Sequence, residues 1–251
     1  MSGTVIVTGG SRGIGAAAAR RLAKDGYDIL INYRNDSTAA EAVAKDVRAA
    51  GRRAEIVGGD VATEAGIDAI FRAADAMGDL AGLVANAGVS DQAGTIETFS
   101  YARVERILRT NLTAVIICAR EAIKRMALKN GGNGGSIVNI SSAAAKLGAP
   151  NQFVDYAATK GAIDTLTIGL ALEWAGEGIR VNAVRPGVID TDMHASVGLP
   201  GRAQKMGPSL PMGRPGTPQE VAEAVAWLIS DAASYSTGTI IDVSGGRSIV
   251  P

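Results

Sequence analysis

The stretch Thr8-Gly-Gly-Ser-Arg-Gly-Ile-Gly15, which decides the fold, joins a short β-branched run to a helical pattern. Its glycines Gly9, Gly13 and Gly15 are spaced G-x-x-x-G-x-G. Glycine permits a tight turn and lets backbone N–H groups approach a pyrophosphate at a helix N-terminus. Glycines in turns also serve structure alone, so the position after the first strand of a βαβ unit is what favours dinucleotide binding.

Strand-like and helix-like patterns alternate from this stretch to the end of the chain. We expect strands at residues 4–8, 27–33, 54–57, 80–85, 136–140, 179–184 and 239–243. We expect helices from residue 14, over 38–50, over 67–77, over 156–175 and from a capping box at 217–220, and two helical stretches over 102–129. This alternation predicts one α/β domain over residues 1–251, a doubly wound parallel sheet, with a substrate-binding lid at about 191–216.

The composition argues against several classes of protein. Lys+Arg and Asp+Glu are both 25, so we expect no nucleic acid or membrane surface as the main partner. The chain enters a strand pattern at Thr4 and has no apolar run of roughly 18 residues, so we expect neither a secretion signal nor a membrane helix. Its one cysteine, Cys118, can form no internal disulfide, which favours a buried small side chain and a cytoplasmic protein. No metal-ligand spacing is present, so we expect no metal.

The end of the second strand bears on the choice of cofactor. Sites for NAD place an acid there, but this strand ends Asn32-Tyr33-Arg34. Arg34 and Arg12 suit the 2′-phosphate of NADP(H), because guanidinium groups match that oxyanion. Asp36 is the rival, since its carboxylate suits a ribose hydroxyl and so leaves NAD(H) open.

Tyr156 and Lys160 form the pattern Y-x-x-x-K, which places both side chains on one helix face. A cation favours the phenolate of a nearby tyrosine, and a phenol tuned in this way suits proton transfer to or from an alcohol oxygen. Ser142 follows the strand at 136–140, at the sheet edge where ligands bind, and Ser141 competes for its role. Asn111 is a further candidate, although asparagine there can also be a plain helix cap.

Taken together, these residues resemble the short-chain dehydrogenase/reductase family over essentially the whole chain. The residues that carry the resemblance are Thr8 to Gly15, Asp60-Val61, Asn86-Ala-Gly88, Asn111, Ser142, Tyr156 with Lys160, and Arg185-Pro-Gly187 with Thr191. The resemblance implies the strand order 3-2-1-4-5-6-7 and hydride transfer between a nicotinamide and a carbonyl or secondary alcohol.

The resemblance also implies a role for each catalytic residue. Tyr156 would be the general acid/base, and Lys160 would bind the nicotinamide ribose and lower the pKa of the tyrosine. Ser142 would orient the substrate carbonyl, and Asn111 would hold a water in a proton relay. The spacing between Ser142 and Tyr156 is one residue longer than the family usually shows. We expect the loop between them to absorb the extra residue.

The cofactor-binding residues that we expect are Gly9, Ser11, Arg12, Gly13, Ile14, Gly15, Arg34, Asp60, Val61, Asn86, Ala87, Gly88, Tyr156, Lys160, Pro186, Gly187 and Thr191. The resemblance further implies a homodimer or homotetramer, formed by pairing the helices near 111–129 and 156–175.

The substrate pocket is expected between residues 143–155 and 191–216. Met193, Val197, Leu199 and Met206 suggest an apolar wall, while Gln152 and His194 suit substrate hydroxyls, unless His194 is simply a solvated loop residue. Ketones, oxoacyl thioesters and sugars all remain open as substrates. Two other hypotheses stay beside an NADP(H)-dependent carbonyl reductase: an NAD(H)-preferring sugar or alcohol dehydrogenase, and a redox sensor that binds a dinucleotide without chemistry.

Overall fold

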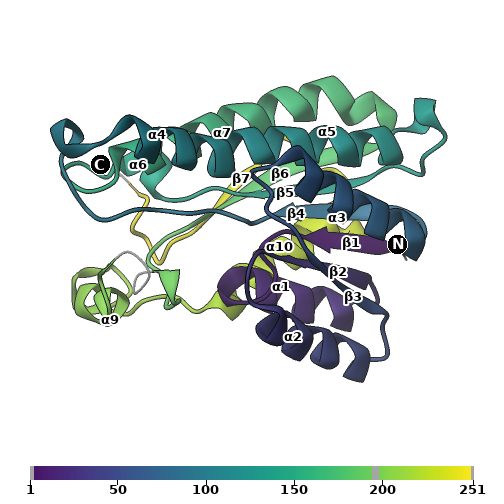
Figure 1. Ribbon diagram of the computed structural model, residues 1–251, viewed down its shortest axis with the longest axis horizontal. Helices are drawn as coiled ribbons and strands as arrows, with labels where there is room; N and C mark the ends of the chain where they lie inside the picture. Colours follow the sequence, from purple (N-terminus) through teal and green to yellow (C-terminus); the bar gives the residue numbers. More distant parts are fainter. Residues whose placement is uncertain (1–2, 194–197, 250–251) are drawn as a thin grey trace.

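The computed structural model of the chain describes residues 3–193 and 198–249. One sheet of parallel strands in the order β3-β2-β1-β4-β5-β6-β7 forms its centre (Figure 1). The strands are β1 (Thr4–Val7), β2 (Asp28–Tyr33), β3 (Ala54–Gly58), β4 (Leu80–Ala85), β5 (Gly135–Ile140), β6 (Ile179–Pro186) and β7 (Ile240–Val243). After β3, at one edge of the sheet, the chain crosses to the other side of β1 and forms β4 there. This reversal of strand order is the arrangement of a Rossmann-type fold and confirms the expected class.

Helices cover both faces of the sheet (Figure 1). The α-helices are α1 (Gly13–Lys24), α2 (Ser37–Ala49), α3 (Glu64–Met77), α4 (Tyr101–Leu108), α5 (Ala114–Met126), α6 (Ala144–Leu147), α7 (Val154–Trp174), α9 (Arg202–Met206) and α10 (Pro218–Ile229). Helices α1, α2 and α10 pack on one face, and α3, α5 and α7 pack on the other. Short 3₁₀ turns lie at Ile96–Thr98, Leu128–Asn130, Ala175–Glu177, Gly207–Ser209 and Asp231–Ala233.

Strand β1 shows why both faces are apolar. Its side chains alternate, so Val5 and Val7 enter the core beneath α1 and α10, whereas Ile6 enters the core beneath α3 and α5. All three are fully buried, as expected for a strand in the middle of a two-sided parallel sheet.

The helix ends follow local chemistry. Thr217 and Glu220 form the expected capping box at the start of α10, with Pro218 in the first turn. Helix α3 begins three residues before the expected start, because Thr63 accepts a hydrogen bond from the Gly66 N–H and caps it.

The two helical stretches expected over residues 102–129 are present as α4 and α5, with a π-helical turn, Arg109–Thr113, between them. The segment expected as a lid at about 191–216 contains the short helix α9. The short helix α6 was not expected from the sequence.

The carboxyl ends of the strands meet at one end of the molecule. Helices α6 and α9 and the segment after β7 gather there, on the left of Figure 1. Within residues 3–193 and 198–249, every helix is too short or too polar to span a bilayer.

Candidate active site

The loop after β1 leaves backbone donors free at the start of α1. Gly9 and Gly13 have positive φ angles of 61° and 55°, which L side chains rarely adopt. A Cβ on Gly15 would lie 2.5 Å from the Gly9 carbonyl oxygen, so a side chain has no room there. The first backbone bond of the helix runs from the Ala16 N–H to the Arg12 carbonyl, and among the described residues the Ile14 and Gly15 N–H groups have no acceptor. Free donors at a helix N-terminus suit a phosphate.

Three polar side chains hold this loop in place. The Asn86 amide nitrogen donates to the carbonyl oxygens of Thr8 and Gly9, at 2.9 and 3.0 Å. The Thr8 hydroxyl accepts from the N–H groups of Asn86 and Ala87, both at 3.0 Å. Asn32 Oδ1 accepts from the Gly9 N–H at 3.2 Å. The loop is therefore tied to the ends of β1, β2 and β4, and the role of Asn32 was missed by the sequence analysis.

The end of β2 presents unpaired positive charge. Arg12 and Arg34 are exposed, and neither guanidinium has a hydrogen bond or ion pair among the described residues. The rival carboxylate of Asp36 caps α2 by accepting the Ala39 N–H at 2.9 Å. This cap gives Asp36 a structural role, while the two arginines have none that the fold explains.

The remaining residues expected around the cofactor line the same end of the sheet. Asp60 Oδ1 accepts the Ala62 N–H at 2.9 Å, and Val61 is buried beside it. A Cβ on Gly13 would lie 3.5 Å from the Thr191 Cγ2 atom, so the segment after β6 meets the loop after β1. A Cβ on Gly187 would lie 2.7 Å from the Ser244 backbone, which again requires glycine. The residues present fit a dinucleotide: free N–H donors, glycines without room for side chains and unpaired arginines occur together.

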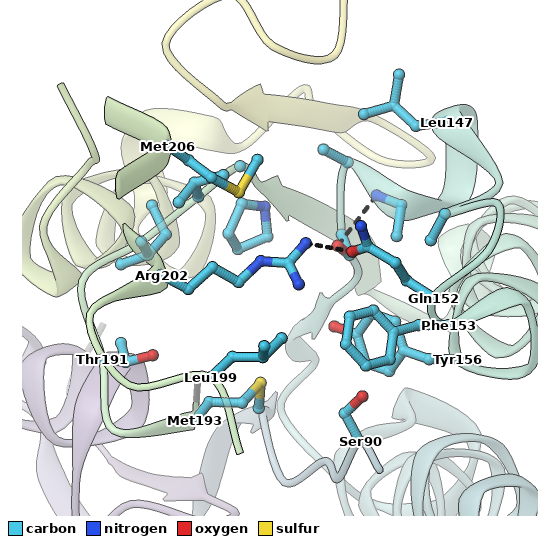
Figure 2. Close-up of a pocket in the computed structure, with 18 of the residues that line it drawn as sticks. Ser90, Leu147, Gln152, Phe153, Tyr156, Thr191, Met193, Leu199, Arg202 and Met206 are labelled. Carbon is cyan, nitrogen blue, oxygen red and sulfur yellow. Dashed lines mark hydrogen bonds between the residues drawn. The ribbon is translucent and has the colours of Figure 1, made fainter. Parts of the chain in front are cut away.

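Tyr156 lies in the first turn of α7 with its side chain at the wall of a cavity (Figure 2). The Asp155 carboxylate accepts the Tyr156 N–H and is paired with Arg103 of α4, at 2.9 and 2.7 Å, which anchors this turn. Burial raises the pKa of the Tyr156 phenol, and its hydrogen bond with the Ser142 side chain acts in the opposite direction. The phenol is therefore neutral at physiological pH.

Lys160 lies one turn further along α7 and is buried. Its ammonium donates to the Ile140 carbonyl at 2.7 Å and lies 5.5 Å from the centre of the Tyr156 ring. Burial lowers the pKa of Lys160 to about 8, and the Asp164 carboxylate partly opposes this shift. Burial has the largest effect on the phenol, so the pKa of Tyr156 is raised on balance in this structure, and a lowering of that pKa by Lys160 stays a prediction.

The two candidate serines have different partners. The Ser141 hydroxyl is buried and donates to Asp164 Oδ1 at 2.7 Å, while Asp164 Oδ2 accepts from Arg185 at 2.8 Å. Ser142 is half-buried, accepts the Ala144 N–H at 3.1 Å and hydrogen-bonds with Tyr156. Ser142 is thus the serine that meets the phenol. Asp164 was missed by the sequence analysis, although it follows Lys160 by four residues and so shares the face of Tyr156 and Lys160.

Asn111 lies in the π-helical turn, not at a helix start, so the alternative of a plain cap is wrong. Its side chain is fully buried and makes two bonds to Val89, donating to the carbonyl and accepting from the N–H, each at 2.8 Å. A Cβ on Gly88 would lie 3.5 Å from Asn111 Oδ1 and 3.9 Å from the Lys160 ammonium. Asn111 and Lys160 therefore face the same small space beside Gly88, and π turns recur at functional sites.

A cavity of about 780 Å³ opens beside Tyr156 and Ser142. Figure 2 shows Gln152, Phe153 and Tyr156 on one side and Met193, Leu199 and Met206 on the other. These belong to the two segments expected from the sequence. His194 and Val197 lie outside the described residues.

The turn between α6 and α7 lies within the stretch from Ser142 to Tyr156 and has an unusual backbone. Gly148, Ala149 and Asn151 all have positive φ angles, of 69°, 44° and 60°. The last two are the only non-glycine residues of the described chain with this conformation. Ala149 lines the cavity, so the strained turn shapes its wall.

Two further residues line the cavity: Arg202, which lies in the expected segment 191–216 but was not singled out, and Arg247, which was not expected from the sequence. They come from α9 and from the segment after β7, and no local motif marks either of them. In the part of the chain that the structure describes, no group of three or more His, Cys, Asp or Glu side chains is arranged to hold a metal ion.

With this site, the chain belongs to the short-chain dehydrogenase/reductase family, whose members are oxidoreductases that bind a nicotinamide dinucleotide. The family model described as Enoyl-(Acyl carrier protein) reductase matches residues 9–248.

Individual relatives share most of the chain. The uncharacterized oxidoreductase YgfF of Escherichia coli is 52% identical over 96% of this chain and 98% of its own length. The 3beta-hydroxysteroid dehydrogenase 1 of Eggerthella lenta is 40% identical over 99% of this chain and 94% of its own. The crystal structure of acetoin dehydrogenase YohF from Salmonella typhimurium superposes with a TM-score of 0.89 at 34% identity, covering 100% of this chain and 99% of that one.

Proposed function

We propose that this protein is an NADP(H)-dependent oxidoreductase that interconverts a carbonyl and a secondary alcohol. The observation that carries the proposal is that Ser142 and Tyr156 adjoin at the wall of the cavity, one helical turn from the buried ammonium of Lys160. One reacting carbon then has beside it a group that transfers a proton, a hydroxyl that binds its oxygen, and a cation: Tyr156, Ser142 and Lys160.

The nicotinamide supplies or accepts a hydride when bound. In the direction of reduction, the neutral phenol of Tyr156 gives its proton to the oxygen of the carbonyl as that oxygen gains negative charge. The Ser142 hydroxyl orients the same oxygen, and the Lys160 ammonium stabilises the phenolate that is left. Asn111 and Lys160 face the same space beside Gly88, and Asn111 would hold there the water through which a proton reaches Lys160.

The cofactor would be held by the loop after β1 and its neighbours. Free N–H groups at the start of α1 suit the pyrophosphate, and Asp60 with Val61 suits the adenine. NADP(H) is favoured over NAD(H) because Arg12 and Arg34 lack partners, whereas Asp36 is engaged as a helix cap.

Relatives named for a steroid and for acetoin differ widely in substrate size, so they support only the general reaction. We propose that residues 191–216 act as the substrate lid of a single catalytic domain, because Thr191, Met193 and Leu199 line the cavity. Exposed apolar side chains on α5 and α7, Ile116, Ile168 and Leu172, support a homodimer or homotetramer. An unpaired cysteine supports a reducing, cytoplasmic compartment.

The proposal is tested by Tyr156→Phe, assayed with NADPH and a panel of ketones by following NADPH absorbance. We expect kcat/KM to fall by roughly 10²–10⁴-fold with NADPH binding retained, because only the proton donor is lost. Undiminished turnover would reject Tyr156 as that donor. Binding of NADPH by the wild type with no turnover of any carbonyl or alcohol would favour the sensor instead.

The cofactor preference is tested by Arg34→Ala, with Arg20→Ala as a matched surface control. We expect the variant to lose about tenfold or more in affinity for NADPH and little for NADH, since a charge-assisted hydrogen bond is worth roughly 1.5–3 kcal/mol. Equal losses for both cofactors would undo the 2′-phosphate assignment.

A further inference from the structure

The charged side chains around the cavity are all of one sign. Of the described residues that line it, Arg202, Lys205 and Arg247 are cationic, and no aspartate or glutamate is among them. Most of the other lining side chains are apolar, among them Leu147, Phe153 and Met206. A cavity that is apolar but holds three cations is built for a ligand with both kinds of surface.

Arg202 projects from α9 into the middle of the cavity (Figure 2). One of its nitrogens donates to the Gln152 side-chain oxygen at 2.5 Å, and the guanidinium lies 5.3 Å from the centre of the Phe153 ring. Both contacts fix the direction of the side chain, but a neutral amide oxygen and an aromatic face leave its charge uncompensated. The remaining N–H groups of Arg202 have no hydrogen-bond acceptor in the part of the chain that the structure describes, so a ligand can use them.

Elsewhere in the protein, half-buried arginines have their guanidinium groups satisfied, by a carboxylate or, for Arg180, by three backbone carbonyls. Arg103 pairs with Asp155 at 2.7 Å, and Arg185 pairs with Asp164 at 2.8 Å. In contrast, neither Arg202 nor Arg247 meets a carboxylate anywhere among residues 3–193 and 198–249.

The two cavity arginines also act on each other. Burial lowers the pKa of the Arg202 guanidinium, and the positive charge of Arg247 lowers it further. Two neighbouring cations that are partly withdrawn from water are unfavourable unless an anion joins them. Nothing in the packing of the fold requires both charges at this place.

We propose, building on the oxidoreductase function above, that Arg202 and Arg247 form an oxyanion subsite, so that the substrate carries a carboxylate or phosphate besides its reacting carbon. The reacting oxygen lies at Ser142 and Tyr156, an apolar spacer contacts the walls, and the anionic group binds the two guanidinium groups. A planar guanidinium binds either anion through two parallel hydrogen bonds, which adds selectivity against neutral analogues.

The decisive experiment compares matched ketones with NADPH as the reductant. Methyl-ketone acids from levulinate to 7-oxooctanoate are each paired with their methyl esters, and dihydroxyacetone phosphate is paired with dihydroxyacetone. We expect the charged member of at least one series to have a kcat/KM about 10–100-fold higher, since charge-assisted bonds contribute roughly 1.5–3 kcal/mol. The series that shows this preference decides between carboxylate and phosphate.

The variants Arg202→Met and Arg247→Met assign the preference to these side chains. We expect each variant to reduce the ratio of charged to neutral kcat/KM about tenfold or more, mainly through KM, and Arg202→Lys to restore part of it. The control is Arg72→Met, an exposed arginine on α3 away from the cavity, which should leave the ratio unchanged.

A second readout needs no turnover. With saturating NADPH filling the phosphate-binding loop and at constant ionic strength, butyrate or inorganic phosphate should raise the melting temperature of the wild type and not that of the Arg202→Met/Arg247→Met double variant. Equal ratios in wild type and variants, with no anion effect on melting, would overturn the subsite while leaving the oxidoreductase function intact. An equal loss of NADPH affinity in both variants would overturn it too, because the arginines would then serve the cofactor. Anion binding without any turnover would instead overturn the proposed function and keep the subsite.

Discussion

The two halves of the site are built in different ways. The cofactor half rests on backbone: glycines without room for a Cβ, free N–H groups and the amides of Asn86 and Asn32 that tie the loop to three strands. The substrate half rests on side chains from α6, α7, α9 and the segment after β7, joined by a turn with left-handed Ala149 and Asn151. The difference teaches that one half recognises a constant ligand through main-chain geometry, while the other can change its ligand by single substitutions.

The largest expected effect falls where the two halves meet, at Lys160. We expect Lys160→Met to reduce kcat/KM by roughly 10²–10⁴-fold, because the buried ammonium no longer stabilises a phenolate at Tyr156. At the same time the protein should become about 2 kcal/mol more stable at pH 7, since a buried charge is removed at the cost of one hydrogen bond to Ile140.

The stability gain of Lys160→Met should depend on pH. Burial places the folded-state pKa of Lys160 at about 8, below its ordinary value of 10.5. The unfolded chain therefore holds this proton more tightly, and the cost of the buried charge is complete below about pH 8 and is lost as pH rises toward 10.5. Denaturant titrations at pH 7 and pH 9.5 measure this. An advantage that does not shrink at the higher pH would contradict the assignment.

The next largest effect tests the cofactor half. We expect Gly15→Ala to weaken NADPH binding by about 10–100-fold, because the added methyl group would lie 2.5 Å from the Gly9 carbonyl and must displace the loop. Fluorescence titration with NADPH measures the change. The control is Gly169→Ala on α7, where a Cβ meets nothing within 4 Å, and which should bind NADPH normally. Normal binding by Gly15→Ala would mean that the loop adapts and is less rigid than its contacts indicate.

The smallest expected effect concerns the strained turn between α6 and α7 in the substrate half. We expect Ala149→Gly to stabilise the protein by about 0.5–1 kcal/mol, because glycine adopts φ 44° without the strain of a Cβ. Ala145→Gly, in the helical turn of α6, should destabilise by a similar amount, since there glycine only adds conformational entropy to the unfolded chain. Thermal unfolding measures both. Equal signs would show that the turn between α6 and α7 is not strained.

Much of the fold could be predicted from neighbouring residues. The strand patterns locate every strand, with each end no more than two residues from its expected place. The capping box at Thr217 begins α10 as expected. The strand order followed from the resemblance, not from any single pattern. The pair Tyr156 and Lys160 needed only the helical repeat, because residues four apart share a face whatever surrounds the helix.

Other parts of the site could not be predicted because distant segments decide them. Ser141 and Ser142 are adjacent and alike in sequence, yet one turns to Asp164 and the other to Tyr156. The π turn holds Asn111 against Val89, which lies far from it along the chain, and no local pattern marks this turn.

The sequence by itself determined the local structure: where strands and helices lie, where glycine is needed, and which face of α7 carries the phenol and the ammonium. Only the tertiary structure decided which charges remain unpaired. Arg202 and Arg247 are 45 positions apart and meet the cavity from different elements, while Arg103 and Arg185 find carboxylates. Whether a charged group is neutralised depends on what folding brings next to it, and that contact is set by topology rather than by spacing along the chain.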